Sequence, residues 1–139
     1  TWFSLLERSL FHAEKLHDVE RRAAGRLRII KTPDDLARLL ADRAAGKKVT
    51  GALLSTEGGQ NLEGQLANVK RLHDAGFRML SLAHFFDTDL AGSMAGETKG
   101  GLTPLGAAVV KEAEKLGMII DLAHPSPAAF ADVLKIATR

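Results

Sequence analysis

Apolar and polar positions along this chain form blocks that predict helices and strands in alternation. Apolar residues recur at intervals of three and four over residues 1–25, 32–46, 62–75, 103–116 and 126–139, which is typical of helices with one buried face. Short, largely apolar runs separate these blocks, and we expect them to be buried strands: RLRII, VTGALLST, FRMLSLAH and MIIDLAH. A Thr-Pro or Ser-Pro pair opens three of the helical blocks, and glycine closes several of them.

The same spacing predicts which helical side chains face the core. The predicted inward residues are Phe3, Leu6, Leu10, Ala13, Leu16 and Val19 in the first block, Leu36, Leu39 and Leu40 in the second, and Leu62, Leu66, Val69 and Leu72 in the third. Thr32, Thr103 and Ser126 are expected to cap the helices that follow them, since each is a hydroxyl residue directly before a proline. Residues 85–101, after the third strand run, are expected to form a long loop.

Strand and helix in alternation, with strands apolar on both faces, predict a parallel sheet covered by helices. Two α/β architectures fit: a doubly wound open sheet, or part of a (β/α)8 TIM barrel. Glu57, His84 and His124 follow three successive strand runs, at the edge where either architecture builds its site. A barrel gathers these ends around one axis, whereas an open sheet spreads them by about 4.8 Å per strand. We therefore favour the barrel.

Composition limits the alternatives further. A chain of 139 residues with 45% hydrophobic content supports one domain at most, over residues 1–139. Lys and Arg number 19 against 17 for Asp and Glu, and their signs alternate along the helices, so nothing indicates nucleic acid or membrane-surface binding. Cysteine is absent, which excludes disulfides and thiolate zinc sites. No apolar run approaches the about 20 residues of a transmembrane helix, and the lack of an initial Met suggests that the chain begins inside a longer one.

The candidate chemistry lies at the strand ends. FRMLSLAH and MIIDLAH both finish on Leu-Ala-His, and Glu57 follows the strand before them. Imidazole and carboxylate are the usual ligands of a hydrolytic zinc site, in which one position stays open for water. Each residue also has a structural interpretation: a histidine at a strand end is often only hydrogen-bonded, and a glutamate before two glycines suits an exposed turn. Asp121 could orient a ligand or accept hydrogen bonds at a helix start. His12, His17 and His73 are expected on helix surfaces.

Two segments resemble the middle of the membrane dipeptidase (renal dipeptidase) family of zinc peptidases. They are GALLSTEGGQNLEGQLANVKRLHDAGFRMLSLAHFF and GLTPLGAAVVKEAEKLGMIIDLAHPS, and the resemblance extends from about Lys48 to Arg139. It implies a (β/α)8 barrel of the amidohydrolase type, two zinc ions and hydrolysis of dipeptides, including some with a D-residue on the carboxyl side. It also implies that Glu57 bridges the two metals, that His124 is a ligand of one of them, and that His84 contacts the substrate and stabilises the tetrahedral intermediate.

The resemblance also implies parts that this chain does not contain. The family's His-x-Asp pair would precede Thr1, and a second histidine for the His124 metal would follow Arg139. A whole barrel takes about 250 residues or more, so the chain is expected to be a central, incomplete portion of the catalytic domain. Gln60 replaces a histidine that many relatives have nearby, and the HFFDTDLAGS loop differs from the Asn-rich loop of mammalian members.

Two functional hypotheses follow. The first is a zinc-dependent dipeptidase that hydrolyses the peptide bond with a metal-activated water. The second is a non-catalytic partial barrel, a fragment or remnant, that acts only through association with missing segments or another copy, since open sheet edges favour association. A doubly wound binding domain without metal is a third reading, and it requires both strand-end histidines to be structural.

Overall fold

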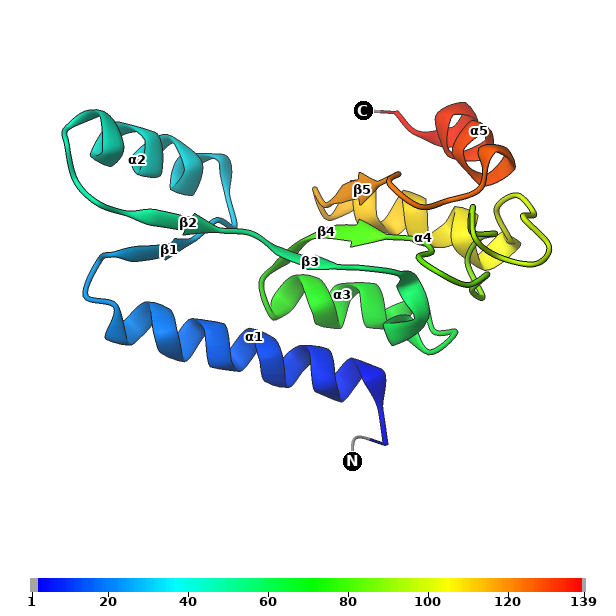
Figure 1. The fold of residues 1–139 in the computed structure, drawn as a ribbon, viewed down its shortest axis with the longest axis horizontal. Helices are drawn as coiled ribbons and strands as arrows, with labels where there is room; N and C mark the ends of the chain where they lie inside the picture. The colour runs from blue at the N-terminus through cyan, green and yellow to red at the C-terminus, as the bar shows by residue number, and fades with distance from the viewer. Residues whose placement is uncertain (1–2, 139) are drawn as a thin grey trace.

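The computed structural model describes residues 3–138 and shows a mixed α/β fold (Figure 1). Its elements, in chain order, are α1 (Leu5–Arg22), β1 (Leu27–Ile29), α2 (Pro33–Ala44), β2 (Thr50–Ala52), β3 (Leu54–Thr56), the 3-10 helix η1 (Gly59–Leu62), α3 (Ala67–Asp74), β4 (Phe77–Ser81), α4 (Pro104–Lys115), β5 (Ile119–Asp121) and α5 (Pro127–Ile136). The alternation of strands and helices predicted from the apolar pattern is confirmed.

The strands form two parallel sheets that follow one another along the chain. β1 pairs with β2, and β3, β4 and β5 form a three-stranded sheet in that order. The predicted strand VTGALLST is therefore interrupted: Leu53 alone separates β2 from β3. In Figure 1 the two strands run on as one path that links the two sheets. All strand pairs are parallel, as expected for part of a (β/α)8 barrel.

Helices cover the strands and close a single main core. α1 packs against η1 and α3, and α4 packs against β5 and α5; in the view of Figure 1, α1 and α3 run below the strands while α2 lies above β1 and β2. The largest fully buried members of the core are Leu6, Leu62, Leu72, Leu80, Leu82 and Leu90. They come from α1, η1, α3, β4 and the loop after β4, so the core lies around the three-stranded sheet.

The three predicted helix caps are confirmed. Thr32 accepts a hydrogen bond from Asp35 N at 3.1 Å, and the Asp35 side chain accepts from Thr32 N in return, which makes a complete capping box. Thr103 accepts from the backbone N–H of Gly106 at 2.9 Å and Ser126 from that of Ala129 at 3.0 Å. In each case the proline that follows occupies the first turn of the helix.

The predicted helix over residues 62–75 is wrong at its start. The chain forms η1, turns at Glu63 and Gly64, both with positive φ, and begins α3 at Ala67. The turn has a long-range cause: the Glu63 carboxylate accepts hydrogen bonds from Ser4 Oγ at 2.8 Å and Leu5 N at 2.7 Å, at the start of α1. These bonds, with that from Ser4 first, hold the pKa of Glu63 below its ordinary value. Leu66, predicted to face inward, is exposed as a result.

Several other predicted inward residues are also exposed. In α2 only Leu39 is buried, whereas Leu36 and Leu40 are 46% and 58% exposed. Within residues 3–138, the main contacts of α2 are with β1 and β2, so the side chains on its other face stay exposed. Phe3, which lies before α1, and Val19 on α1 are both exposed.

Two helical histidines are more buried than expected. His17 places Nε2 3.0 Å from the carbonyl oxygen of Ala75, and only about a quarter of its side chain is exposed (27%). The side chain of His73 is likewise 24% exposed. His12 is exposed on α1, as predicted. The sequence could not indicate the contact of His17, because its partner Ala75 lies 58 residues further along the chain.

Candidate metal centre

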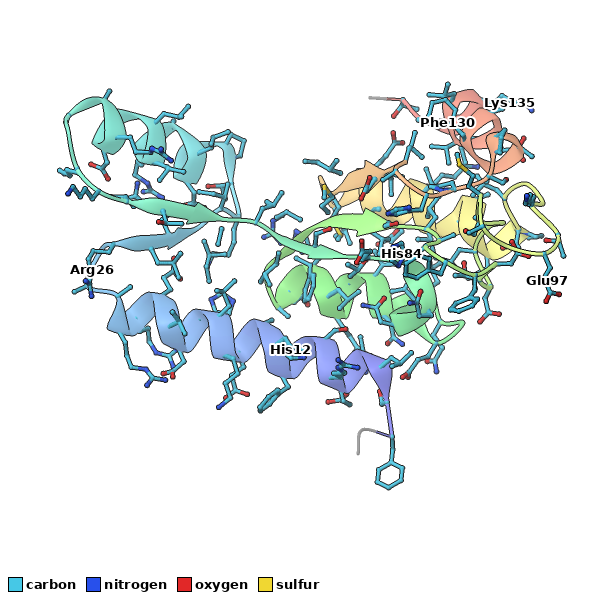
Figure 2. The ribbon with its side chains drawn as sticks, in the orientation of Figure 1. His12, Arg26, His84, Glu97, Phe130 and Lys135 are labelled. Atoms are coloured by element: carbon cyan, nitrogen blue, oxygen red, sulfur yellow. The ribbon has the colours of Figure 1, made fainter. Side chains whose placement is uncertain are left out.

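The three candidate residues come from the C-terminal ends of three neighbouring strands. Glu57 directly follows β3, which ends at Thr56. His84 and His124 each lie three residues beyond their strands, which end at Ser81 and Asp121. Figure 2 shows His84 at this end of the sheet, toward the loop that carries Glu97. The two imidazoles therefore stand in the turns that follow the strands and not in the strands themselves.

Strand register explains why the two histidines meet. β4 and β5 pair from Met79 with Ile119 to Ser81 with Asp121. His84 and His124 lie at the same distance beyond the last pair, so parallel strands bring them to the same height. Their ring centroids are 4.3 Å apart and the ring planes are inclined by 67°. The two Leu-Ala-His segments of the sequence thus end on histidines that lie side by side in the structure.

Glu57 completes the cluster. Its Oε1 atom lies 3.4 Å from His84 Nε2 and 3.8 Å from His124 Nε2. One candidate ligand atom from each of the three residues lies within 4.8 Å of the other two. The Glu57 side chain is 70% exposed, whereas that of His84 is 18% exposed and that of His124 40%. The carboxylate is therefore the most exposed member of the cluster, and one of its oxygens lies near both imidazoles.

The two glycines after Glu57 have a steric purpose. Gly58 has a φ of 94°, in the left-handed region that favours glycine. A Cβ atom on Gly59 would lie 2.2 Å from Leu90 Cδ1 and 3.1 Å from the carbonyl oxygen of Leu82. Gly59 N also donates a hydrogen bond to that same oxygen at 3.2 Å. The Glu-Gly-Gly segment thus turns sharply and docks on the loop that carries His84.

Asp121 shapes the turn before His124. Its Oδ1 atom accepts a hydrogen bond from the backbone N–H of Ala123 at 3.0 Å. This bond is local to the turn, and through the backbone it helps to place His124. The ligand-orienting role that the sequence indicates for Asp121 stays a prediction.

The loop over residues 85–101 is folded around Asp87, a residue that the sequence did not single out. Asp87 accepts hydrogen bonds from Ser93 N and Thr98 N, both at 2.8 Å, and from Thr98 Oγ1 at 2.9 Å. These bonds, the one from Ser93 first, hold the pKa of Asp87 below its ordinary value. No local pattern predicted this, because the bonds span six and eleven residues.

A hollow of about 460 Å³ opens beside His84. Its lining includes Gln60, Phe85 and Phe86. Both phenylalanines are largely exposed, and the Phe85 ring lies against His84 with centroids 4.0 Å apart. A second hollow of about 450 Å³ lies between α1 and β3, and Glu57 is part of its lining. The hollow beside His84 thus offers space for a small polar ligand with an apolar part.

The donor set fits a divalent metal ion. A carboxylate and two imidazoles are ligands of catalytic zinc, and their approach from three separate strands leaves coordination positions open. Open positions are what a hydrolytic site needs, since water and substrate must reach the ion. The parallel strands, the helix layer and these strand-end donors are those of part of a (β/α)8 barrel with a candidate metal site.

Comparison with known proteins identifies the family. The family model described as "Membrane dipeptidase (Peptidase family M19)" matches residues 4–139. The chain therefore belongs to the membrane dipeptidase family, whose members are metallopeptidases. The resemblance inferred from the Glu-Gly-Gly and Leu-Ala-His motifs is confirmed, and the match reaches further toward the N-terminus than those motifs.

Solved structures agree on the fold. An amidohydrolase from Pseudomonas aeruginosa matches with a TM-score of 0.80 and 17% identity, over 91% of this chain and 37% of that chain. The probable dipeptidase PvdM from Pseudomonas aeruginosa matches with a TM-score of 0.79 and 23% identity, over 90% of this chain and 32% of that chain. A metallopeptidase from Rhodobacter sphaeroides, liganded with a phosphinate mimic of the dipeptide L-Ala-D-Ala, matches with a TM-score of 0.79 and 24% identity. The match covers 90% of this chain and 36% of that chain. The chain thus spans about a third of the length of these structures, which confirms the expected partial barrel.

Over residues 3–138, no helix combines the length and the apolar character needed to cross a bilayer. The division of the chain into one incomplete domain over residues 1–139 stays a prediction.

Proposed function

We propose that this chain supplies the central metal-binding segment of a zinc-dependent dipeptidase, in which Glu57 and His124 are metal ligands and His84 faces the substrate. The reaction is hydrolysis of a dipeptide bond by a metal-activated water. The observation that supports the proposal is that Glu57, His84 and His124, at the ends of three successive strands, place one donor atom each within 4.8 Å of one another. Two of these side chains can therefore hold an ion while the third stands beside it. Family membership supplies the reaction class.

Each residue has a separate task in this proposal. Zinc, when bound, acts as a Lewis acid and lowers the pKa of its water to about 7. Glu57 offers two carboxylate oxygens and would hold metal through them, which fits the metal-bridging role that the family resemblance implies. His124 offers one imidazole nitrogen. The His84 N–H is suited to donate a hydrogen bond to the carbonyl oxygen that gains negative charge during attack.

The choice of a dipeptide substrate rests on relatives and on the size of the site. One similar structure carries a phosphinate mimic of the dipeptide L-Ala-D-Ala. The hollow of about 460 Å³ beside His84 is of a size that accepts a small molecule. Phe85 and Phe86 give one wall of that hollow an apolar surface.

A second candidate function is a non-catalytic partial barrel that works through association. β5 is an edge strand of the described sheet, and its Ile119 is 55% exposed. Phe130 and Leu134 on α5 are also exposed. Because unpaired strand edges and exposed apolar side chains favour association, this face is suited to contact missing barrel segments or another copy of the chain.

Metal content tests the proposal first. The chain, its Glu57→Gln, His124→Ala double variant and a matched Glu14→Gln, His12→Ala double variant on exposed positions of α1 are dialysed against buffered zinc and analysed for zinc per chain. We expect zinc in the wild type and the α1 variant and its loss in the site variant, because only the latter removes strand-end donors.

The other outcomes are equally informative. Zinc retained in the site variant would contradict the assigned ligands. Zinc absent from all three chains would favour the associating partial barrel, and the same variants in the complete protein would then decide whether these residues bind metal in the assembled barrel. Dipeptide hydrolysis, assayed on the complete protein, should fall with the zinc.

A further inference from the structure

We propose that Ser93 is a positioning residue: the loop around it fastens the turn of His84 to the turn of His124 and so fixes the spacing of the two imidazoles. The inference rests on the proposed function, because it concerns how well the same site binds zinc. It starts from the position of the two rings. Both stand three residues beyond the last strand pair, so the sheet ladder alone does not hold them.

Ser93 makes a direct contact with the His84 turn. Its hydroxyl donates a hydrogen bond to the carbonyl oxygen of His84, and it accepts one from Ala95 N at 3.1 Å. The Ser93 side chain is fully buried. The bond is part-buried, and loss of the hydroxyl would leave the carbonyl oxygen of His84 without this donor.

The residues next to Ser93 hold the other turn. Met94 N donates a hydrogen bond to the carbonyl oxygen of His124 at 2.9 Å. Ser93 itself forms an isolated antiparallel bridge with Pro125, and Ser126 N donates to the carbonyl oxygen of Gly92 at 2.9 Å. Three consecutive residues of one loop thus contact the main chain of both histidine turns.

The loop is itself rigidly folded. Asp87 accepts from Ser93 N at 2.8 Å, and it leaves no room beside it, since a Cβ atom on Gly96 would lie 2.0 Å from Asp87 Oδ1. Thr88 Oγ1 donates to the carbonyl oxygen of Leu82 at 2.8 Å, just before His84. A loop fixed at both ends and in its middle can transmit its geometry to the turns that it joins.

The consequence concerns metal affinity. His84 is not one of the proposed ligands, but it supports both of them: its Nε2 atom lies 3.4 Å from Glu57 Oε1, and its ring lies against that of His124 with centroids 4.3 Å apart. If the bond from Ser93 to His84 is removed, the His84 turn loses one of its fixed contacts, and the two ligands beside it meet the ion less often in the right geometry. Groups that support metal ligands from outside typically change affinity by about 10–100-fold when they are removed.

The test measures metal binding in the complete protein that contains this chain. Ser93→Ala removes the hydroxyl, Ser93→Thr retains it, and Thr103→Ala is the matched control. Thr103 Oγ1 likewise donates to a loop carbonyl, that of Asp89, at 2.6 Å and accepts from Gly106 N at 2.9 Å, but it touches neither histidine turn in the described structure. For each variant, the zinc dissociation constant is measured by chelator competition, the visible spectrum is recorded with cobalt(II) in place of zinc, and the thermal midpoint is determined.

We expect Ser93→Ala to weaken zinc binding by about tenfold or more and to shift the cobalt bands, with recovery of both in Ser93→Thr. Thr103→Ala should lower the thermal midpoint while zinc affinity and the cobalt spectrum stay unchanged. Equal zinc affinity and equal spectra in Ser93→Ala and Thr103→Ala would overturn the inference. Should Ser93→Ala not fold, Ser93→Cys, whose thiol is a weaker donor, is judged by the same criteria.

A fourth variant separates this inference from the proposed function. If Glu57→Gln, His124→Ala binds zinc as the wild type does, the assigned metal site is wrong. If that variant loses zinc while Ser93→Ala keeps wild-type affinity and spectrum, the site stands and only the positioning role of Ser93 fails.

Discussion

The sheet of β3, β4 and β5 and the sheet of β1 and β2 contain the same kind of parallel pair, but they are covered differently. Around the first, α1, α3, α4 and α5 enclose the main core. That core, as far as the described residues show, takes no side chain from β1, β2 or α2. Figure 1 shows the β1–β2–α2 unit extending away from the rest. The candidate site stands over the well-covered sheet.

Polar contacts hold the outer unit in place. Arg28 Nη2 lies 2.8 Å from Asp42 Oδ2, and the Glu20 carboxylate on α1 accepts a hydrogen bond from Ile29 N at 2.6 Å. The buried apolar residues of this unit are few, chiefly Ile29, Leu39 and Val49. Because a close-packed core resists small displacements better than solvated polar pairs do, donor atoms are held most accurately over the three-stranded sheet.

The largest expected difference between the two regions is the effect of removing a leucine. Leu80 is fully buried in β4, so Leu80→Ala should lower the free energy of unfolding by about 3 kcal/mol. Leu40→Ala, at a position 58% exposed on α2, should change it by less than about 0.5 kcal/mol. Urea unfolding measures both. Similar losses of unfolding free energy in the two variants would show that α2 is covered in solution, and the difference between the two sheets would then not hold.

A smaller difference is expected at two glycines, one in each region. Gly59→Ala forces a methyl group against Leu90 and the Leu82 carbonyl, and should cost about 2 kcal/mol. In Gly51→Ala the new methyl group meets only the end of the Leu39 side chain, at 2.4 Å, and that side chain can move aside. We therefore expect a clearly lower thermal midpoint for Gly59→Ala than for Gly51→Ala. The reverse order would mean that the Glu-Gly-Gly segment yields more easily than β2.

The smallest effect concerns the acid stability of the outer unit. Hydrogen bonds from Thr32, and then from Arg38, lower the pKa of Asp35 to about 2. Since the folded value lies below the unfolded one, the carboxylate contributes stability above about pH 4 and loses it as the pH falls toward 2. Asp35→Asn should therefore cost about 1 kcal/mol near pH 6 and almost nothing near pH 2.

The check is the free energy of unfolding of Asp35→Asn and wild type across this pH range. Asp34→Asn is the control, since Asp34 precedes Asp35 in the same turn but does not belong to the capping box. A constant difference between wild type and Asp35→Asn at all pH values would contradict the stabilising role of the carboxylate.

The sequence predicted those features that depend on neighbouring residues. Thr32, Thr103 and Ser126 cap helices because a hydroxyl two or three residues before a backbone N–H suffices. Glu57, His84 and His124 could be grouped because parallel strands end at one edge of a sheet. The break at Glu63, the exposure of Leu40 and the contacts of Ser93 could not be predicted. Each depends on a partner or a missing cover that is distant in the chain.

Because His84 and His124 lie equally far beyond paired strand ends, the site depends on the number of residues between each strand and its histidine. The sequence separation between His84 and His124 equals that between Ser81 and Asp121, the last pair of the two strands. Two short spacers, one after Ser81 and one after Asp121, must therefore keep equal length, whereas the turn between α4 and β5 has no such constraint. A single residue inserted in either spacer would lie outside every strand and helix, and it would still move one imidazole away from the height of the other.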